Sequence, residues 1–367
     1  MDKKTLVVLL DADGCYYNRK YEERLWYVIA RYRSEIEFIA KHPDMTGNRE
    51  ALERIRYDAI TATIPKDILH NVPTEKKIAL FNTFTGYLDQ LIPGLIDVIL
   101  WRENKILIEK LAKDVTEKNI GEIILMVGSA RQSFSIDDYN NKKFGTRSFF
   151  PSLEKFASML HEKFSKELSV AVSMETFLLS DLYSNVQPGE SYRRIMMELI
   201  NHAPQSQCNS VHDKSKFTLV YAALNHLAQK YSEKYLNNEL LVEYFDDTAF
   251  IHDSLMRASS KKHADLMLPE NIPLYLYLYM GDKISENEMH LIQGKGKPDR
   301  NFAEKCKQMM KICRKMASDR VGIDVANQLD FMSFMQQKAS VNPILAFFRK
   351  CESVLSHDAI IRHTAQP

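Results

Sequence analysis

Apolar and polar positions alternate along this chain in a way that predicts strands separated by helices. Apolar runs of strand length occur at residues 6–10, 122–127, 168–174, 240–245 and 274–279. Between these runs apolar side chains recur at helical spacing, most clearly over residues 25–39, 78–91 and 149–164. Strands that alternate with helices are typical of an α/β protein with a mainly parallel, doubly wound sheet, and we expect that fold class here.

The stretch between the first two strands is much longer than a single crossover helix requires. Three amphipathic helices are expected in it, over residues 25–39, 52–60 and 78–91. We therefore expect a core of residues 1–17 and 93–300, interrupted by a helical insertion at 18–92 and followed by a helical C-terminal extension at 301–367. A crossover helix that returns to the sheet, through Ile106, Leu107, Leu111 and Val115, is expected after the insertion. The insertion either roofs a site on the core or forms a remote helical domain.

Polar side chains stand where several of the predicted strands end. Asp11 and Asp13 follow the first strand, Ser129 follows the second, and Asp246 and Asp247 close a later one. Because ligands of open α/β sheets bind beyond the carboxyl ends of the strands, these residues predict one site. Two alternatives for the first pair are a purely structural strand end and a calcium loop. A calcium loop needs further oxygen ligands, and the next residues of the chain do not supply them in the required pattern.

These residue types suit the hydrolysis of a phosphate monoester. The reaction needs a nucleophile, a proton donor for the leaving oxygen, and positive charge around the phosphoryl oxygens. Asp11 is the expected nucleophile, and Asp13, two residues further on, is the expected acid and base. Lys214 and Lys216 stand at the start of an amphipathic stretch, and one of them is the expected source of positive charge. The alternative is that both lysines are simply solvated.

Carboxylates clustered beside a phosphate repel it unless a hard cation neutralises them, so the set predicts Mg²⁺ as the cofactor. Asp246 and Asp247 are the natural ligands, with Asp11 as a further one. One member of the Asp246–Asp247 pair can instead hold the lysine in position. Ser129 is expected to donate a hydrogen bond to a phosphoryl oxygen.

The order Asp-x-Asp, Ser, Lys, Asp-Asp over residues 6–247 resembles the four motifs of the haloacid dehalogenase-like (HAD) superfamily. Most members of that superfamily are phosphatases. The resemblance implies a Rossmann-like core with a C1-type helical cap, and it adds the backbone carbonyl of Asp13 to the magnesium ligands. It also favours Lys216 over Lys214, because the family's lysine stands at the start of the helix that leads to the Asp-Asp strand. A carboxylate two residues after the nucleophile is usual in the phosphatases and phosphomutases and lacking in the dehalogenases. The resemblance thus implies a magnesium-dependent phosphomonoester hydrolase, with a small phosphorylated metabolite or a phosphotyrosine protein as substrate.

The composition fits a cytoplasmic enzyme. Lys and Arg number 49 against 48 Asp and Glu, a net charge of +1, so no bulk attraction to nucleic acid or to a membrane is expected. The five cysteines form no CxxC pair, which favours a reducing compartment. No apolar run approaches the roughly twenty residues of a membrane span. An alternative function is a secreted effector that binds a host protein in the host cytosol, because residues 179–183 and the tail loosely resemble HAD-type proteins of type IV secretion systems.

Four further features leave alternatives open. Cys15 is interpreted as a packed bystander thiol rather than a nucleophile, because no phosphate-binding loop ending in Arg follows it. Arg131 either binds substrate phosphate or is an ordinary arginine at a helix start. Asp181 is expected to have a structural or cap-closing role rather than a catalytic one, in a stretch that is either strand or loop. The tyrosine-rich run at 274–279 is expected to be a half-buried strand.

Overall fold

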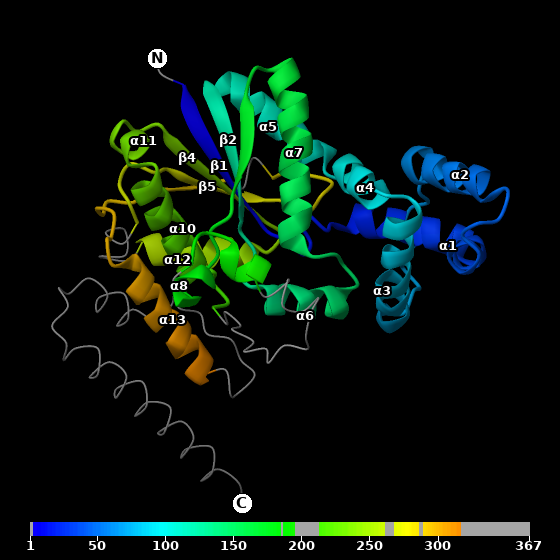
Figure 1. Cartoon of the computed structure of the whole chain (residues 1–367). Helices are drawn as coiled ribbons and strands as arrows, with labels where there is room; N and C mark the ends of the chain where they lie inside the picture. Colours follow the sequence, from blue (N-terminus) through cyan, green and yellow to red (C-terminus); the bar gives the residue numbers. More distant parts are fainter. Residues whose placement is uncertain (1–2, 185, 195–212, 261–267, 286–288, 317–367) are drawn as a thin grey trace, which may run out of the picture.

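The computed structural model describes residues 3–184, 186–194, 213–260, 268–285 and 289–316 (Figure 1). Six strands form one sheet in the order β3-β2-β1-β4-β5-β6. Their bounds are β1 Lys4–Leu10, β2 Ile120–Val127, β3 Ala171–Glu175, β4 Leu240–Asp246, β5 Leu274–Leu278 and β6 His290–Ile292. All neighbouring pairs are parallel except β5 and β6. The predicted α/β class with a mainly parallel sheet is confirmed.

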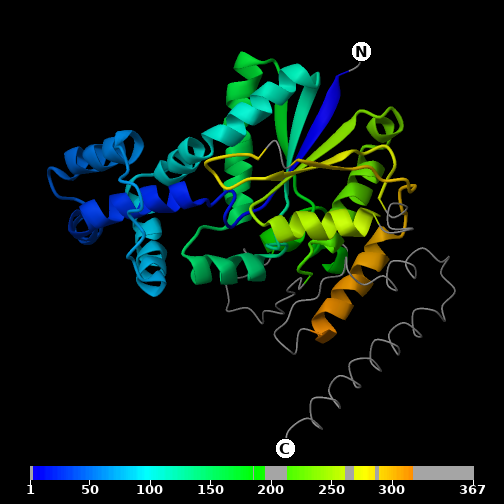
Figure 2. The same ribbon diagram turned by 180° about the vertical axis from the view of Figure 1, so that it is seen from behind.

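The central strand β1 is buried on both faces, which is why its sequence is a continuous apolar run. Leu6 and Val8 pack into one hydrophobic core, and Val7 and Leu9 pack into a second core on the opposite face. The first core is covered by α4 Leu95–Glu103, α5 Lys105–Glu117 and α7 Phe149–Glu167. The second is covered by α10 Phe217–Lys230, α11 Ser232–Leu236, α12 Ala249–Ser260 and α13 Phe302–Met316. Figures 1 and 2 show α5 and α7 on one face of the sheet and α10 and α12 on the other, as in a doubly wound fold, with α4 between α7 and the insertion.

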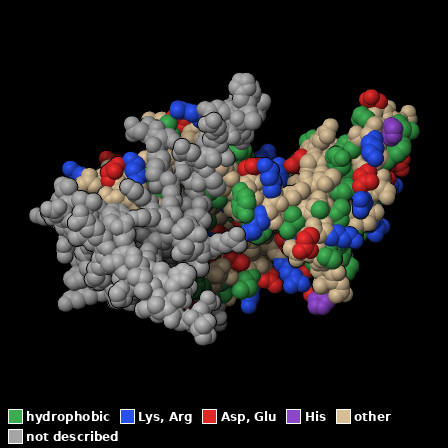
Figure 3. Space-filling view, turned by 90° about the horizontal axis from the view of Figure 1, so that it is seen from below, with side chains coloured by type: hydrophobic (Ala, Val, Ile, Leu, Met, Phe, Trp, Pro, Cys, Tyr) green, Lys and Arg blue, Asp and Glu red, His purple; other side chains and the backbone are tan. Residues whose placement is uncertain are grey.

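The expected helical insertion follows β1. It consists of α1 Arg19–Lys41, α2 Asn48–Thr61 and α3 Thr74–Leu91. The side chain of Asn18 caps α1 by accepting a hydrogen bond from the Tyr21 backbone N–H at 3.0 Å. The three helices pack on one another and on α4, and they extend to one side of the sheet (Figure 1). Seen from below, charges of both signs are interspersed on this lobe (Figure 3).

The expected crossover helix is present as α5, and an additional helix, α4, precedes it, with Asn104 between the two. The Asn104 side-chain amide donates to the backbone carbonyls of Tyr16 and Leu100, and its oxygen accepts from the Tyr279 hydroxyl at 2.8 Å. This side chain therefore ties the helix break to the segment that follows β1. Two short helices, α6 Phe134–Phe144 and α8 Asp181–Ser184, complete the described elements not yet named.

The tyrosine-rich strand β5 is confirmed as a strand, but it is not half-buried. Its leucines and Tyr277 are buried, Tyr275 is partly buried, and Tyr279, the residue after the strand, is buried as well. The reason is that α5 covers this face, with the Lys110 amine 4.4 Å from the centre of the Tyr277 ring. The stretch at 176–183 is a loop that leads into α8 rather than a strand. Of the predicted C-terminal extension, only α13 lies in the described residues, and it is helical as expected.

Among the described residues, no helix combines the length and the apolar character needed to cross a lipid bilayer.

Candidate active site

The parallel register of three strands brings the predicted site residues to one edge of the sheet. Leu10 of β1 is level with Val127 of β2 and with Phe245 of β4, so the residues that follow each strand are neighbours. The Asp11 backbone N–H donates to the Phe245 carbonyl at 3.0 Å, and the Gly128 N–H donates to the Leu10 carbonyl at 2.9 Å. This close approach leaves no room for a side chain at Gly128, because a Cβ there would lie 2.8 Å from the Leu10 nitrogen.

Lys216 is the lysine that the fold brings to these strand ends. Its Nζ donates to Asp11 Oδ1 and to Asp246 Oδ2, each at 2.6 Å. Lys216 precedes α10 with a φ of +53°, a left-handed backbone conformation that is uncommon outside glycine. Asp213 accepts hydrogen bonds from Ser215 and Thr218 and so fixes the turn that holds this conformation. Lys214 is exposed, so of the two candidate lysines Lys216 is the one whose amine contacts Asp11 and Asp246.

The two carboxylates that end β4 have different surroundings. Asp246 is fully buried, and it accepts hydrogen bonds from Lys216, from the Tyr244 hydroxyl at 2.7 Å and from the Thr248 N–H at 2.9 Å. Asp247 is partly exposed and lies against Gly14, where a Cβ would come within 2.0 Å of its Oδ2. Asp246 thus orients the lysine, whereas the Asp247 carboxylate lines the open part of the site.

The electrostatics of the site are dominated by burial and by crowding of like charges. Burial raises the pKa of Asp11 to about 7, opposed by Lys216 and reinforced by Asp246. Burial alone would also raise the pKa of Asp246, but the charge and hydrogen bond of Lys216 outweigh it and hold that pKa below its ordinary value. Burial would lower the pKa of Lys216, yet Asp11 and Asp246 raise it instead. The lysine is therefore cationic, and the cluster carries more negative than positive charge.

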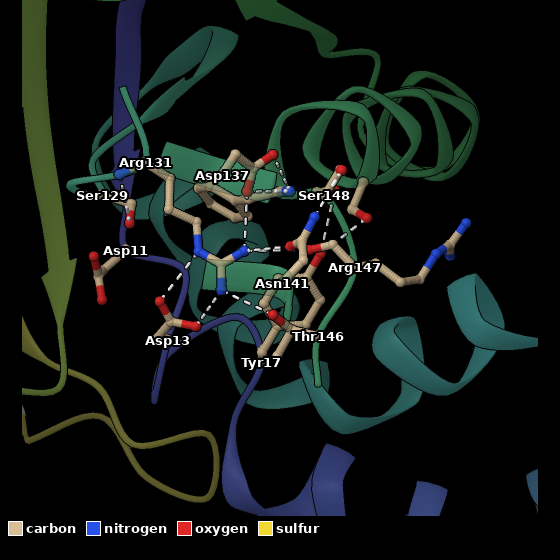
Figure 4. A network of polar contacts seen from close by, with 12 residues as sticks. Asp11, Asp13, Tyr17, Ser129, Arg131, Asp137, Asn141, Thr146, Arg147 and Ser148 are labelled. Carbon is tan, nitrogen blue, oxygen red and sulfur yellow. Dashed lines mark hydrogen bonds and ion pairs between the residues drawn. The ribbon is translucent and has the colours of Figure 1, made fainter. Parts of the chain in front are cut away.

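Asp13 is held by a buried arginine, as Figure 4 shows. Arg131 donates from Nε to Asp13 Oδ2 at 3.1 Å and from Nη2 to Asp13 Oδ1 at 2.5 Å. The same guanidinium contacts Asp137 and Asn141 of α6 and Thr146. Reasoning from the sequence missed these three residues. The only signal for them is that positions 137 and 141 are four apart and share one face of a helix.

Ser129 is buried at the end of β2. Its Oγ accepts a hydrogen bond from the Arg131 backbone N–H at 3.4 Å, and its carbonyl accepts from the Gln132 side chain at 2.8 Å. These contacts fix the loop that turns the Ser129 hydroxyl toward the cavity.

The strand ends open into one cavity of about 440 Å³. Its floor is formed by five of the six predicted site residues, namely Asp11, Asp13, Ser129, Lys216 and Asp247. Its walls include Tyr17, Glu22 of α1, and Asn140 and Phe144 of α6. The walls thus come from both the insertion and α6, and a substrate-selecting role for the insertion stays a prediction.

Carboxylate oxygens suited to a hard cation lie on this floor. Single ligand atoms of Asp11, Cys15 and Asp247 lie within 4.8 Å of one another. Asp11 and Asp247 offer the oxygen ligands that Mg²⁺ prefers, and the crowding of negative charge fits a bound cation. The Cys15 thiol is buried and donates to the Tyr279 carbonyl at 3.1 Å, and burial raises its pKa. Cys15 therefore packs as the sequence suggested, and the donor set fits magnesium through its carboxylates.

Asp181 lies outside this cluster and has structural partners. Its carboxylate accepts hydrogen bonds from the backbone N–H groups of Leu178, Gly189 and Ser191. These contacts fold the loop after β3, as expected for a structural residue.

Comparisons of the chain with known protein families, with curated proteins and with solved structures returned no match. Membership of the HAD superfamily accordingly stays a prediction from the motifs.

Proposed function

We propose that this protein is a magnesium-dependent phosphomonoester hydrolase that acts through an aspartyl phosphate at Asp11. The observation that carries the proposal is the position of Lys216 Nζ, 2.6 Å from both Asp11 and Asp246, on the floor of a cavity that Asp13 and Ser129 also line. A cation, a hydroxyl donor and a buried carboxylate nucleophile around one cavity are the groups that phosphoryl transfer requires.

In the proposed reaction an Asp11 oxygen attacks phosphorus, and the bond from phosphorus to the leaving oxygen breaks. Asp13 gives a proton to that oxygen, and the alcohol departs. Water then attacks the phosphorus of the aspartyl phosphate, Asp13 takes the proton of that water, and Asp11 is restored as phosphate leaves. Lys216 and Ser129 bind the phosphoryl oxygens in both steps, and Lys216 also offsets the negative charge of Asp246.

Asp11, Asp247 and the backbone carbonyl of Asp13 are the groups that would hold Mg²⁺. Asp246 contributes through Lys216 and as a neighbouring negative charge. When bound, the cation supplies positive charge that offsets the repulsion between the carboxylates and an incoming phosphate.

The cavity volume of about 440 Å³ lies within the range of small-molecule sites, roughly 300–1,000 Å³. A small phosphorylated metabolite therefore suits the cavity, and a phosphotyrosine side chain, which presents a single ring and phosphate, suits it as well.

A phosphate-release screen tests the proposal. Wild-type protein would be assayed on sugar phosphates, nucleotides, para-nitrophenyl phosphate and phosphotyrosine peptides, each with Mg²⁺ and with EDTA. Turnover of at least one ester with Mg²⁺, and its loss in EDTA, is the expected result. A protein that releases phosphate from none of these esters, or that is indifferent to EDTA, would contradict the proposal. The absence of turnover on all of them would favour the effector alternative instead.

A further inference from the structure

Arg131 occupies an unusual place for a charged residue. It is one of the largest side chains in the fully buried set, with 1% of its surface exposed, and it lies between Asp13 and α6 (Figure 4). Its backbone follows β2, two residues after Ser129. A buried guanidinium is retained only where its hydrogen bonds and charge are satisfied, so its partners indicate its role.

The guanidinium binds the Asp13 carboxylate through two of its nitrogens. Nε and Nη2 each donate to a different oxygen of the carboxylate, at 3.1 and 2.5 Å. Two parallel hydrogen bonds of this kind fix both the position and the plane of a carboxylate. The Asp13 side chain is 35% exposed at the edge of the cavity, so this contact is what orients it.

The far side of the guanidinium is anchored to α6 and to the turn that follows it. Nη1 donates to Asp137 Oδ1 at 2.9 Å and to Asn141 Oδ1 at 2.7 Å, and Nη2 donates to Thr146 Oγ1 at 2.8 Å. A guanidinium has five N–H donors, and these contacts together with the Asp13 pair use all of them. In this arrangement Arg131 has no donor to offer a substrate phosphate, so the geometry disfavours a phosphate-binding role.

We propose that Arg131 is a positioning residue that orients Asp13 for proton transfer and couples it to α6. This inference rests on the proposed phosphatase function. Arg131 touches neither the phosphorus nor the leaving oxygen, and it acts through the carboxylate that does. Asn140 and Phe144, which line the cavity, belong to the same helix as the anchors Asp137 and Asn141. A substrate that packs on α6 therefore contacts the element that sets the orientation of Asp13.

Leaving-group dependence separates this role from a merely structural one. An alkyl phosphate releases a strongly basic oxygen and depends on a proton from Asp13, whereas para-nitrophenyl phosphate releases a weakly basic oxygen and does not. For Arg131→Gln we expect kcat/KM on an alkyl phosphate to fall about 100-fold, in line with the loss of general acid catalysis. On para-nitrophenyl phosphate we expect a fall of less than about fivefold. Arg131→Lys, which keeps the charge without the paired donors, should give an intermediate ratio.

Two further variants keep the test decisive. Asn141→Ala removes one anchor of the guanidinium and leaves Arg131 in place, so it should shift the ratio in the same direction by a smaller factor, even where Arg131→Gln does not fold. Arg24→Gln is the matched control. Arg24 is also buried, and it pairs with Glu103 and donates to the backbone carbonyls of Ala59 and Ala62, away from the site. It should lower stability and leave the ratio of the two esters unchanged.

The possible results are distinguishable. Equal losses on both esters in folded Arg131→Lys and Asn141→Ala proteins would overturn the positioning role while leaving the phosphatase function intact. A wild-type protein that hydrolyses neither ester would overturn the proposed function and this inference with it. A selective loss on the alkyl ester, with Arg24→Gln unchanged in ratio, would support both.

Discussion

Two buried carboxylates at the carboxyl ends of strands in the same sheet have pKa values that are shifted in opposite directions. Asp11 follows β1, and Glu175 ends β3. Each accepts a hydrogen bond from a lysine amine at 2.6 Å, and both lysines belong to one segment, since Lys216 precedes α10 and Lys230 is its last residue. Yet the pKa of Asp11 is raised to about 7, and that of Glu175 is lowered to about 2.

The difference lies in the other neighbours. Burial raises the pKa of Asp11, and the nearby Asp246 and Asp13 carboxylates add to that effect against Lys216. For Glu175, burial is outweighed by the nearby His226 side chain and by the hydrogen bond and positive charge of Lys230. A short contact to a lysine therefore does not identify a site. A candidate site is better identified by surplus negative charge around a buried carboxylate that lies next to a cavity.

The largest expected effect concerns turnover. Asp11→Asn should reduce kcat by about three orders of magnitude or more, because it removes a covalent nucleophile at nearly constant shape. Glu175→Gln, the matched change at the other carboxylate, should alter kcat by less than about threefold, because a site remote from the reaction gives no transition-state contact. Initial rates on the best ester from the screen measure both. Similar losses in the two variants would remove the distinction between the carboxylates.

The second prediction concerns the divided roles of Asp246 and Asp247. Asp247→Asn should raise the Mg²⁺ concentration for half-maximal activity by roughly 10- to 100-fold, as expected for a lost ligand. Asp246→Asn should mainly lower turnover at saturating Mg²⁺, because Lys216 loses one charged partner. Magnesium titrations of activity and of Tm after EDTA treatment distinguish the two. A larger increase in the Mg²⁺ requirement for Asp246→Asn than for Asp247→Asn would make Asp246 the magnesium ligand and contradict the assigned roles.

The third prediction concerns how the opposite pKa shifts of Asp11 and Glu175 affect thermal stability, measured as Tm in the presence of EDTA. Asp11 has a pKa of about 7 in the folded protein against an ordinary 3.8, so its ionisation opposes folding, and the stability of the wild type falls as pH rises between those values. Asp11→Asn removes this loss, and its Tm should exceed that of the wild type by about 3 °C or more at pH 8 but not at pH 4.

Glu175 should show the reverse dependence. Its pKa of about 2 against an ordinary 4.5 means that its contribution to stability is present above pH 4.5 and is lost as pH falls toward 2. Glu175→Gln should therefore lower Tm at pH 7, with a difference from the wild type that shrinks below pH 4.5. Thermal melts across pH 3–8 test both variants. A change in Tm at pH 7 of the same sign for Asp11→Asn and Glu175→Gln would contradict the comparison.

The smallest expected effect comes from alanine substitutions at two glycines whose backbone φ is positive. Gly14 and Gly47 have φ values of +81° and +98°, but only at Gly14 would a Cβ meet a neighbour, the Asp247 carboxylate at 2.0 Å. Both alanine variants should lose about 1 kcal/mol from the strained conformation. Only Gly14→Ala should also raise the Mg²⁺ requirement, by about threefold to tenfold, because it displaces Asp247. Urea denaturation and a magnesium titration measure the two effects, and a shifted titration for Gly47→Ala would contradict the assignment.

The sequence predicts those parts of the site that depend on local pattern. Asp11, Ser129 and Asp247 follow apolar runs, and parallel pairing brings the ends of such runs together whatever the details of packing. Lys216 is predictable for the same reason, since it begins the helix that leads into the next strand.

The rest depends on tertiary contacts that no short pattern records. The partners of Arg131 come from α6 and from the turn after it, and their approach is set by how α6 packs. The helix break at Asn104 likewise depends on a hydroxyl from Tyr279, 175 positions away in the chain. The burial of β5 failed as a prediction because alternation shows which residues share a face and does not show what covers that face.

The central place of β1 also has a consequence for how the chain is made. Its two neighbours, β2 and β4, begin at Ile120 and Leu240, and the Lys216–Asp11 contact spans 205 positions. At a synthesis rate of about 5–20 residues per second, β1 leaves the ribosome on the order of ten seconds or more before β4 exists. The helices α1–α3 close their own local contacts in that interval, while the apolar strand β1 lacks both of its neighbours until β2 is made and lacks β4 until later. This apolar strand is the stretch on which a chaperone would act during translation.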